Sequence, residues 1–471
     1  MKKIILKVIL SLAATPVFSQ TTFSPTPVAS GAAPWLLNFN PPPGSGRISH
    51  LKGDMGPLAL SLAARHYADS LSVEDLYNNA PLFNTGLSSA AMMLNRSLLT
   101  SAEMGGNCMR SPEGFAWALI EPVPSVYNYR LCDTIVRYGN LHGVHILGTI
   151  NFYTDSACSC DDSVVTGCPL FGSNGPMYFI NNYRTGNICS DDTGRYKIFV
   201  QNLVEHYDGD GVDDMPGLTD PVLYWEIGNE PEGGCANGMS AFQYGENLRM
   251  AYQAVKAACP VCKVLHAGTI GDSAPLFWDS VYTFYHDYID IANIHVNAPK
   301  DHIFDFNWMQ HQVDWINNAR SNYGVNWNVW VTEWGIYSGS PDGAVQTPFV
   351  SEEEQAGRYA KFYSYGLANH ITNWVFDQQG DTASGIGSSA LLVNVGPDRY
   401  ARLSLYTLWL YDSKFAVIDS AKIDLFSTSR SFPTGLIRVF KNGDEYDVVW
   451  GVLNLPPFIN GIKKYYGYLW P

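Results

Sequence analysis

Two glutamates stand in short apolar segments of the kind that form buried strands. Glu230 closes the run Tyr-Trp-Glu-Ile-Gly-Asn-Glu at 224–230, and Glu333 lies in Val-Trp-Val-Thr-Glu-Trp-Gly at 329–335. A pair of carboxyl groups can divide acid and nucleophile chemistry, since one can hold a proton while the other stays ionised. The sequence contains no HExxH, P-loop or GxSxG motif, so the candidate nucleophiles are carboxylates rather than serine or cysteine with histidine.

The elements that must position these glutamates alternate regularly from about residue 106 onward. The predicted strands are 107–110, 144–150, 222–227, 263–267, 291–296, 329–332 and 372–376. The predicted helices are 131–140, 196–206, 242–258, 276–288, 304–322, 352–368 and 400–411. Strands that alternate with helices of this length indicate βα units around a parallel sheet. An eighth strand could come from residues 51–100, so we predict an α/β chain with a (β/α)8 TIM barrel, and a doubly wound open sheet is the alternative.

The remaining segments suggest four parts in the chain. We expect a signal peptide at 1–20, a Pro- and Gly-rich extension at 21–50, the catalytic barrel at 51–412 and a small all-β domain at 413–471. In the last part, 436–440 and 446–452 flank Lys-Asn-Gly-Asp, which is typical of a hairpin with a tight Asn-Gly turn.

The carboxyl ends of the strands meet on one face of a barrel, where active sites lie. If Glu230 ends strand four, Glu333 ends strand seven. This arrangement resembles the retaining glycoside hydrolases of the large (β/α)8-barrel clan, clan A, and is similar to its β-xylosidase-like and endoglycanase-like branches. The resemblance covers about residues 106–412, and the segment Trp-Ala-Leu-Ile-Glu-Pro at 117–122 also looks like this clan.

The resemblance implies a role for each matching residue. Glu230 would be the acid/base, and Glu333 the nucleophile, with the two carboxyl groups about 5–5.5 Å apart. Arg110 would support the nucleophile, Asn229 would bond the sugar 2-hydroxyl, and His295 would lie close to the nucleophile. The ordinary alternatives are an ion-pair arginine and a core histidine.

Two tryptophans complete the predicted substrate site. Trp374 would form the aromatic floor under the reacting sugar, with a core tryptophan as the ordinary alternative, and Trp334 would flank the cleft. The resemblance thus implies a retaining β-glycoside hydrolase that acts on plant or algal β-linked glycans or oligosaccharides. The alternative is a non-catalytic glycan-binding surface protein on the same scaffold.

The segment Asp-Gly-Asp-Gly-Val-Asp-Asp at 208–214 is a second candidate site. Asp208, Asp210 and Asp214 form an oxygen-rich turn of the kind that calcium uses, although the distal bidentate glutamate of an EF-hand is missing. The alternative is a solvated acidic loop. Two-carboxylate hydrolysis requires no cofactor, so calcium would be structural.

The net charge of the chain limits its possible partners, and the leader indicates its cellular location. The chain of 471 residues has a formal net charge of −15, which argues against nucleic acid and anionic membranes as partners. A neutral carbohydrate suits this charge, and no segment beyond the leader is apolar enough to span a membrane. The leader predicts a secreted or periplasmic protein.

In an exported protein, disulfides are the expected state of cysteine. Four cysteines between 158 and 189 suggest a long loop held by one or two bridges, and Cys259 and Cys262 suggest a local bridge.

Overall fold

The structure is a computed structural model of the chain. It describes residues 48–49, 108–111, 115–121, 125–151, 154–155, 183–184, 193–232, 239–269, 274–298, 306–336, 352–376, 380–381, 392–395, 398–402, 404–405, 407–408, 418–427 and 434–450. Several predictions lie outside these residues: the leader 1–20, most of the extension 21–50, the source of an eighth strand at 51–100 and most of the cysteine-rich stretch 158–189.

Seven parallel strands form the central sheet. They are β2 (Cys108–Ser111), β3 (His145–Ile150), β6 (Tyr224–Ile227), β7 (Lys263–His266), β8 (Ile291–Ala298), β9 (Asn328–Ile336) and β10 (Ile371–Phe376). They follow one another across the sheet in chain order, and the outermost strands β10 and β2 also contact each other. A doubly wound sheet would reverse direction at a switch point. The sheet is therefore nearly closed, which confirms the predicted barrel fold.

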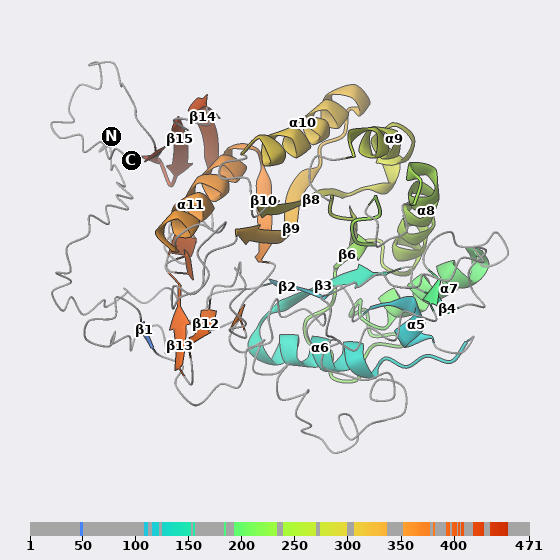
Figure 1. The fold of residues 1–471 in the computed structure, drawn as a ribbon. Coiled ribbons are helices and arrows are strands. Elements are labelled where there is room, and N and C mark those ends of the chain that lie inside the picture. The colour runs from blue at the N-terminus through green and yellow to red at the C-terminus, as the bar shows by residue number, and fades with distance from the viewer. Residues whose placement is uncertain are drawn as a thin grey trace, which may run out of the picture.

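Helices surround the sheet (Figure 1). They are α5 (Trp117–Ile120), α6 (Arg130–His142), α7 (Thr193–Glu205), α8 (Ala241–Ala258), α9 (Pro275–Tyr285), the 3-10 turn η4 (His286–Tyr288), α10 (Phe306–Tyr323) and α11 (Glu352–Ala368). Local chemistry marks some ends: Ser240 and Gln243 form a reciprocal capping box before α8, and Gly143 ends α6 in the left-handed conformation. The predicted helices between residues 131 and 368 all have a counterpart here.

The interior of the barrel changes from apolar to polar along the strands. Leu147, Leu265, Ile291 and Trp330 form a separate buried apolar cluster. Successive side chains in a strand point to opposite faces, so the residue two positions further on shares the same face. Those positions carry polar groups: Leu147 is followed by Thr149, Ile291 by Asn293, and Trp330 by Thr332. The polar layer lies toward the carboxyl ends of the strands, where the candidate site was predicted.

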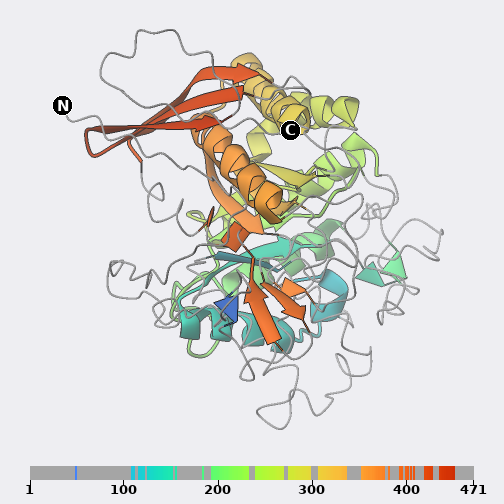
Figure 2. The same cartoon turned by 60° about the vertical axis from the view of Figure 1, so that its left-hand side comes forward.

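A three-stranded antiparallel sheet follows the barrel in the chain. It consists of β14 (Ser420–Ser427), β15 (Thr434–Lys441) and β16 (Asp444–Trp450). Asn442 and Gly443 join β15 to β16 with positive φ angles of 53° and 80°, as a tight Asn-Gly hairpin turn requires. Ile437 and Val439 of this sheet pack against Ala360 of α11. The ribbon of the sheet runs beside the barrel in Figure 2. The predicted hairpin is therefore present and rests on the barrel.

A second small sheet was missed by the sequence reading. Its order is β1 (Ile48–Ser49), β13 (Asp398–Ala401), β12 (Leu392–Val395) and β11 (Gly380–Asp381). The helix predicted from residue 400 therefore begins as strand β13, and helical turns follow at 404–405 and 407–408. β1 comes from the predicted Pro- and Gly-rich extension, in which no strand was expected. Its pairing partner lies some 350 residues away in the chain, which local periodicity cannot reveal.

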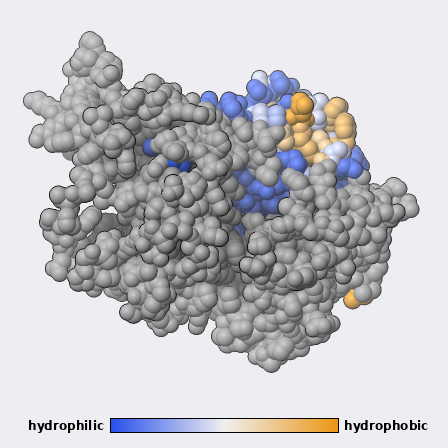
Figure 3. Space-filling model, in the orientation of Figure 1, coloured by the Kyte–Doolittle hydropathy of each residue, from blue (hydrophilic) through white to orange (hydrophobic). Residues whose placement is uncertain are grey.

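Cys259 and Cys262 form the predicted local disulfide at the end of α8. Within the described ranges, no helix is long and apolar enough to cross a membrane. The large apolar side chains exposed on α8 and α9 are Phe242, Leu276 and Phe284, and apolar colour gathers on that part of the surface in Figure 3.

Candidate active site

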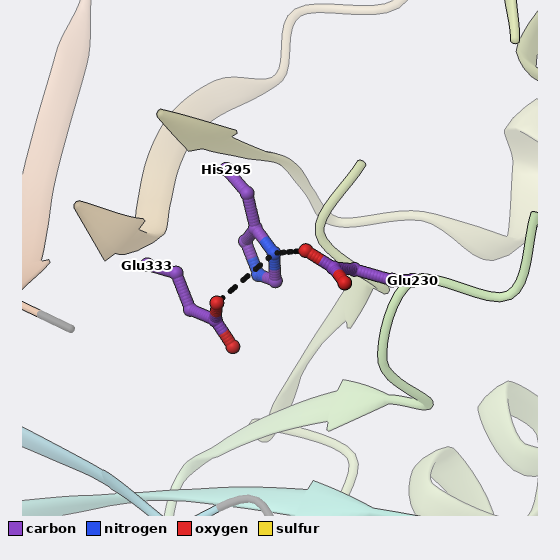
Figure 4. Close-up of side chains that lie close together, drawn as sticks. All are labelled: Glu230, His295 and Glu333. Atoms are coloured by element: carbon purple, nitrogen blue, oxygen red, sulfur yellow. Dashed lines mark hydrogen bonds and ion pairs between the residues drawn. The ribbon is translucent and has the colours of Figure 1, made fainter. Parts of the chain in front are cut away.

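Glu230, His295 and Glu333 meet at the carboxyl ends of their strands (Figure 4). The Nδ1 atom of His295 lies 2.7 Å from Oε1 of Glu230 and 3.6 Å from Oε2 of Glu333. One carboxylate oxygen of each glutamate lies within 4.8 Å of the other. The two glutamates that the sequence placed at strand ends are therefore brought together, with His295 between them.

The turn after β6 aims Glu230 at this cluster. The strand ends at Ile227, Gly228 has a φ of 80°, and Glu230 itself has a φ of 42°. A non-glycine residue in the left-handed region is uncommon and is often found where function fixes the backbone. The side chain of Glu230 remains 25% exposed, whereas that of Glu333 is 8% exposed. Glu230 therefore lies nearer to solvent than its partner.

A local irregularity in β9 turns Glu333 inward. Ile294 of β8 pairs with Val331, but the next residue, His295, pairs with Glu333, so Thr332 is an extra residue in β9. Such a bulge lets two successive side chains serve the same face. Both Thr332 and Glu333 make hydrogen bonds inside the barrel.

Arg110 from β2 bonds polar groups of β6, of the turn after β6, and of β9. Its Nη1 donates to Oε1 of Glu333 at 2.6 Å, and its Nη2 donates to Oδ1 of Asn229 at 2.6 Å. Its Nε donates to Glu226. Burial alone would lower the pKa of Arg110, but the negative charges of Glu226 and Glu333 outweigh it and raise that pKa. The arginine therefore stays charged beside Glu333, where the resemblance placed it.

Glu226 is a buried site residue that the sequence reading missed. Its side chain is fully buried on β6, four residues before Glu230. Besides Arg110, its donors are Thr149, Gly268, Asn293 and Thr332. The sequence did carry a signal for this residue, since Glu226 is a charged residue inside the otherwise apolar strand Tyr224–Ile227. A carboxylate in such a strand must be ion-paired or hydrogen-bonded.

His295 is almost completely buried, and the charges of neighbouring side chains control its pKa. Burial alone would lower the pKa of His295. The negative charge of Glu333 and the hydrogen bond and charge of Glu230 outweigh this effect and raise the pKa above its ordinary value.

The structure does not bring Trp334 and Trp374 to this cluster. Trp334 is fully buried on the outer face of the sheet, where its ring lies 4.7 Å from that of Tyr359 on α11. Trp374 packs against Trp334, with ring centroids 4.2 Å apart, and against Tyr363 of the same helix. This corrects the expectation that the two tryptophans flank a cleft, because both rings pack between the sheet and α11.

The acidic loop lies apart from the glutamates. One oxygen from each of Asp208, Asp210 and Asp214 comes within 4.8 Å of the others. The carboxylates already accept hydrogen bonds from backbone N–H groups in the same loop: Asp214 from Gly209 and Gly211, Asp208 from the backbone of Asp210, and Asp210 from Val212. Calcium binding in this loop stays a prediction.

The comparisons with known proteins bear on the fold. No protein-family model matches the sequence, and no curated protein matches it. A family 39 glycoside hydrolase from the gut symbiont Bacteroides cellulosilyticus has a similar structure, with a TM-score of 0.52, 16% identity and coverage of 76% of this chain and 67% of that one.

Two further matched structures have lower scores. A monomeric beta-xylosidase from Caulobacter crescentus has a TM-score of 0.48 and 14% identity, with 75% of this chain and 70% of that one covered. Xylanase 10B from Thermotoga maritima has a TM-score of 0.46 and 13% identity, with 74% and 99% covered. The strand order of the central sheet and its likeness to the family 39 structure show the barrel fold that the resemblance implied.

Proposed function

We propose that the protein is a retaining β-glycoside hydrolase that works by double displacement, with Glu333 as nucleophile and Glu230 as acid/base. The observation that carries the proposal is the pair of carboxylates with oxygens within 4.8 Å of each other. Retaining glycosidases hold their carboxyl groups about 5–5.5 Å apart, whereas inverting enzymes need about 6.5–9.5 Å to admit a water molecule. The short separation supports retention.

In the first step Glu333 attacks the anomeric carbon, and the bond to the leaving oxygen breaks as Glu230 gives that oxygen its proton. The attacking group must stay ionised, and the hydrogen bond from Nη1 of Arg110 to Oε1 of Glu333 stabilises the charged form. The second oxygen of Glu333, Oε2, lies 3.6 Å from Nδ1 of His295. That oxygen is the one we assign to the attack.

In the second step Glu230, now ionised, takes a proton from water, and the hydroxide formed replaces Glu333 at the anomeric carbon. Asn229 supports binding in both steps. Its Oδ1 accepts from Arg110, which leaves its Nδ2 group as a donor for a sugar hydroxyl. Hydrogen bonds to the 2-hydroxyl strengthen in the transition state, so this donor would contribute to rate as well as to affinity.

The substrate class and the compartment are part of the same proposal. The negative net charge of −15 suits an uncharged polymer, and the resemblance favours plant or algal β-linked glycans cut by a β-xylosidase or an endo-β-glycanase. The leader supports secretion or a periplasmic location.

Substitution of each glutamate by glutamine tests the proposal. We expect Glu333→Gln to lower kcat on the natural glycan by at least about 10⁴-fold and Glu230→Gln by about 10²–10⁴-fold, because each variant loses one essential group. With a dinitrophenyl β-glycoside, which needs no acid to leave, Glu230→Gln should still undergo the first step. The glycosyl-enzyme should then accumulate and add the mass of one sugar to the intact protein.

The matched control is Glu246→Gln, because Glu246 is a half-exposed surface glutamate on α8 paired with Arg249. It should leave turnover unchanged. NMR of the first product formed should show the β-anomer. Full activity in Glu333→Gln, or an α-anomer as first product, would rule out the assignment.

A further inference from the structure

Glu226 acts only as an acceptor at the base of the site. Its Oε1 accepts from Nδ2 of Asn293 at 2.6 Å and from the hydroxyl of Thr332 at 2.9 Å. The same Nδ2 group donates to the backbone oxygen of His266 at 3.1 Å, so both of its neighbours are acceptors and the amide orientation is fixed. The Oε2 atom of Glu226 accepts from Arg110 and Thr149. Glu226 is therefore a carboxylate with no proton to offer.

Thr332 passes this constraint on to His295. A hydroxyl group has one proton, and that of Thr332 points to Glu226. The oxygen of Thr332 lies 3.1 Å from Nε2 of His295, and it can only accept there. The Nε2 atom must therefore carry a proton.

The opposite nitrogen of the ring also faces acceptors. Nδ1 of His295 lies 2.7 Å from Oε1 of Glu230 and 3.6 Å from Oε2 of Glu333. When Glu230 holds its proton on the other oxygen, Oε2, where a leaving group would be reached, Oε1 has no proton to give. A hydrogen bond between Oε1 and Nδ1 then needs a proton on Nδ1.

We propose that Thr332, backed by Glu226, is a positioning residue that keeps His295 as an imidazolium ion, which donates from Nδ1 to Glu230 throughout the reaction. The inference rests on the proposed function of Glu230 and Glu333. A cation bonded to Oε1 strengthens Glu230 as an acid and stabilises its carboxylate after the proton has left. The raised pKa of His295 agrees with this state.

The charges of the cluster stay balanced through the first step. The charged and titratable groups around His295 are Arg110 of β2, Glu226 of β6, Glu230 after β6, His266 of β7 and Glu333 of β9. With neutral His266 and protonated Glu230, two cations face two carboxylates. In the glycosyl-enzyme Glu333 is a neutral ester and Glu230 has become the carboxylate, so the balance is unchanged. Buried charge is costly unless it is paired, and a neutral His295 would leave one negative charge in excess in both states.

The test compares Thr332→Val with Thr332→Ser, because valine removes the acceptor and serine keeps it at nearly the same place. Without the hydroxyl, the protonated ring loses a partner. We expect the pKa of His295 to fall by about one unit in Thr332→Val and to return in Thr332→Ser. In kcat/KM measured against pH, the valine variant should lose the high-pH part of the profile about one pH unit earlier than the wild type, and serine should restore it.

A second measurement needs no activity. In protein labelled with 15N-histidine, the His295 signals are identified by their loss in His295→Gln. Both ring nitrogens should be protonated at pH 6 in the wild type. An unprotonated ring nitrogen at that pH, or an unchanged pH profile in Thr332→Val, would overturn the proposal. If the wild type cleaves no glycoside, the proposed function fails, and the NMR result still decides the state of His295.

Discussion

His266 and His295 lie on the neighbouring strands β7 and β8, both almost completely buried, yet their pKa values move in opposite directions. Burial lowers the pKa of His266 to about 4, whereas the charges of Glu333 and Glu230 overcome burial and raise the pKa of His295. The two rings differ in the face of the sheet that they occupy. His266 points outward and packs against Trp278 of α9, and His295 points into the barrel.

The contrast shows that the partners of a buried group, rather than burial itself, decide its chemistry. His266 is bonded as a neutral ring: its Nε2 accepts from the backbone N–H of Asn293 at 2.9 Å, and its Nδ1 donates to the carbonyl oxygen of Ala267 at 2.7 Å. His295 faces only acceptors on the inner face. One barrel wall therefore separates an uncharged packing layer from a charged site.

The largest expected effect comes from removing the buried anion of the inner face. Glu226→Gln leaves Arg110 facing an amide where a carboxylate stood, and breaking a buried ion pair in this way costs about 3–5 kcal/mol. We expect the free energy of unfolding to fall by that amount in a urea titration. The same change at the exposed Glu246, paired with Arg249, should cost at most about 1 kcal/mol. Equal losses in the two variants would show that the inner charges are not paired as described.

The two histidines should shape the dependence of stability on pH in opposite directions. The unfolded pKa of histidine is about 6.5. Below pH 6.5 His266 binds a proton in the unfolded chain but stays neutral in the folded protein. The free energy of unfolding should therefore fall by about 3 kcal/mol between about pH 6.5 and pH 4. For His295 the folded pKa is the higher one, so its contribution is complete below about pH 6.5 and is lost as the pH rises through the folded value.

Chemical denaturation across this range, in wild type, His266→Gln and His295→Gln, separates the two contributions. In the plot of unfolding free energy against pH, the acid side should flatten in His266→Gln and the alkaline side in His295→Gln. If both sides of the curve persist in both variants, other groups control the pH dependence. The two histidines would then not contribute to stability in opposite directions.

Much of this arrangement could be predicted from the sequence, and the errors have physical reasons. Alternating strands and helices gave the barrel, and Glu230 and Glu333 were placed together because parallel strands end on one face. Successive strand residues face opposite sides, so Trp334, next to the inward Glu333, belongs to the outer face. Trp374 was harder to place, because the pairing of β10 with β9 shifts register on both sides of it.

The polar layer beneath the catalytic pair was missed for a related reason. Glu226 follows Tyr224 by two residues on β6, so alternation places it on the face of Tyr224, whose ring contacts that of the inward Trp330. Thr332 lies two residues after the inward Trp330 and faces inward by the same alternation. Glu333 faces inward only because of the bulge opposite His295, and a bulge depends on the partner strand. Alternation could therefore have found both Glu226 and Thr332, but by itself it would have placed Glu333 on the outer face.

Activity should depend on the position of the His295 ring as well as on its charge. A Cβ atom at Gly268 would lie 1.9 Å from Nε2 of His295 and 2.0 Å from its Cδ2 atom, so Gly268→Ala must displace the ring. Overpacking of this kind costs about 1–3 kcal/mol. Because the displaced ring would lose Thr332 and Glu230 together, we expect kcat to fall about 10-fold or more while circular dichroism shows the fold retained.

Gly357→Ala is the matched control, since a Cβ there, on helix α11, meets nothing within 4 Å and alanine favours a helix. This variant should be neutral or slightly more stable and fully active. Wild-type kcat in Gly268→Ala would mean that the inner face tolerates a moved imidazole, and that the site depends on its charge rather than on the position of the ring.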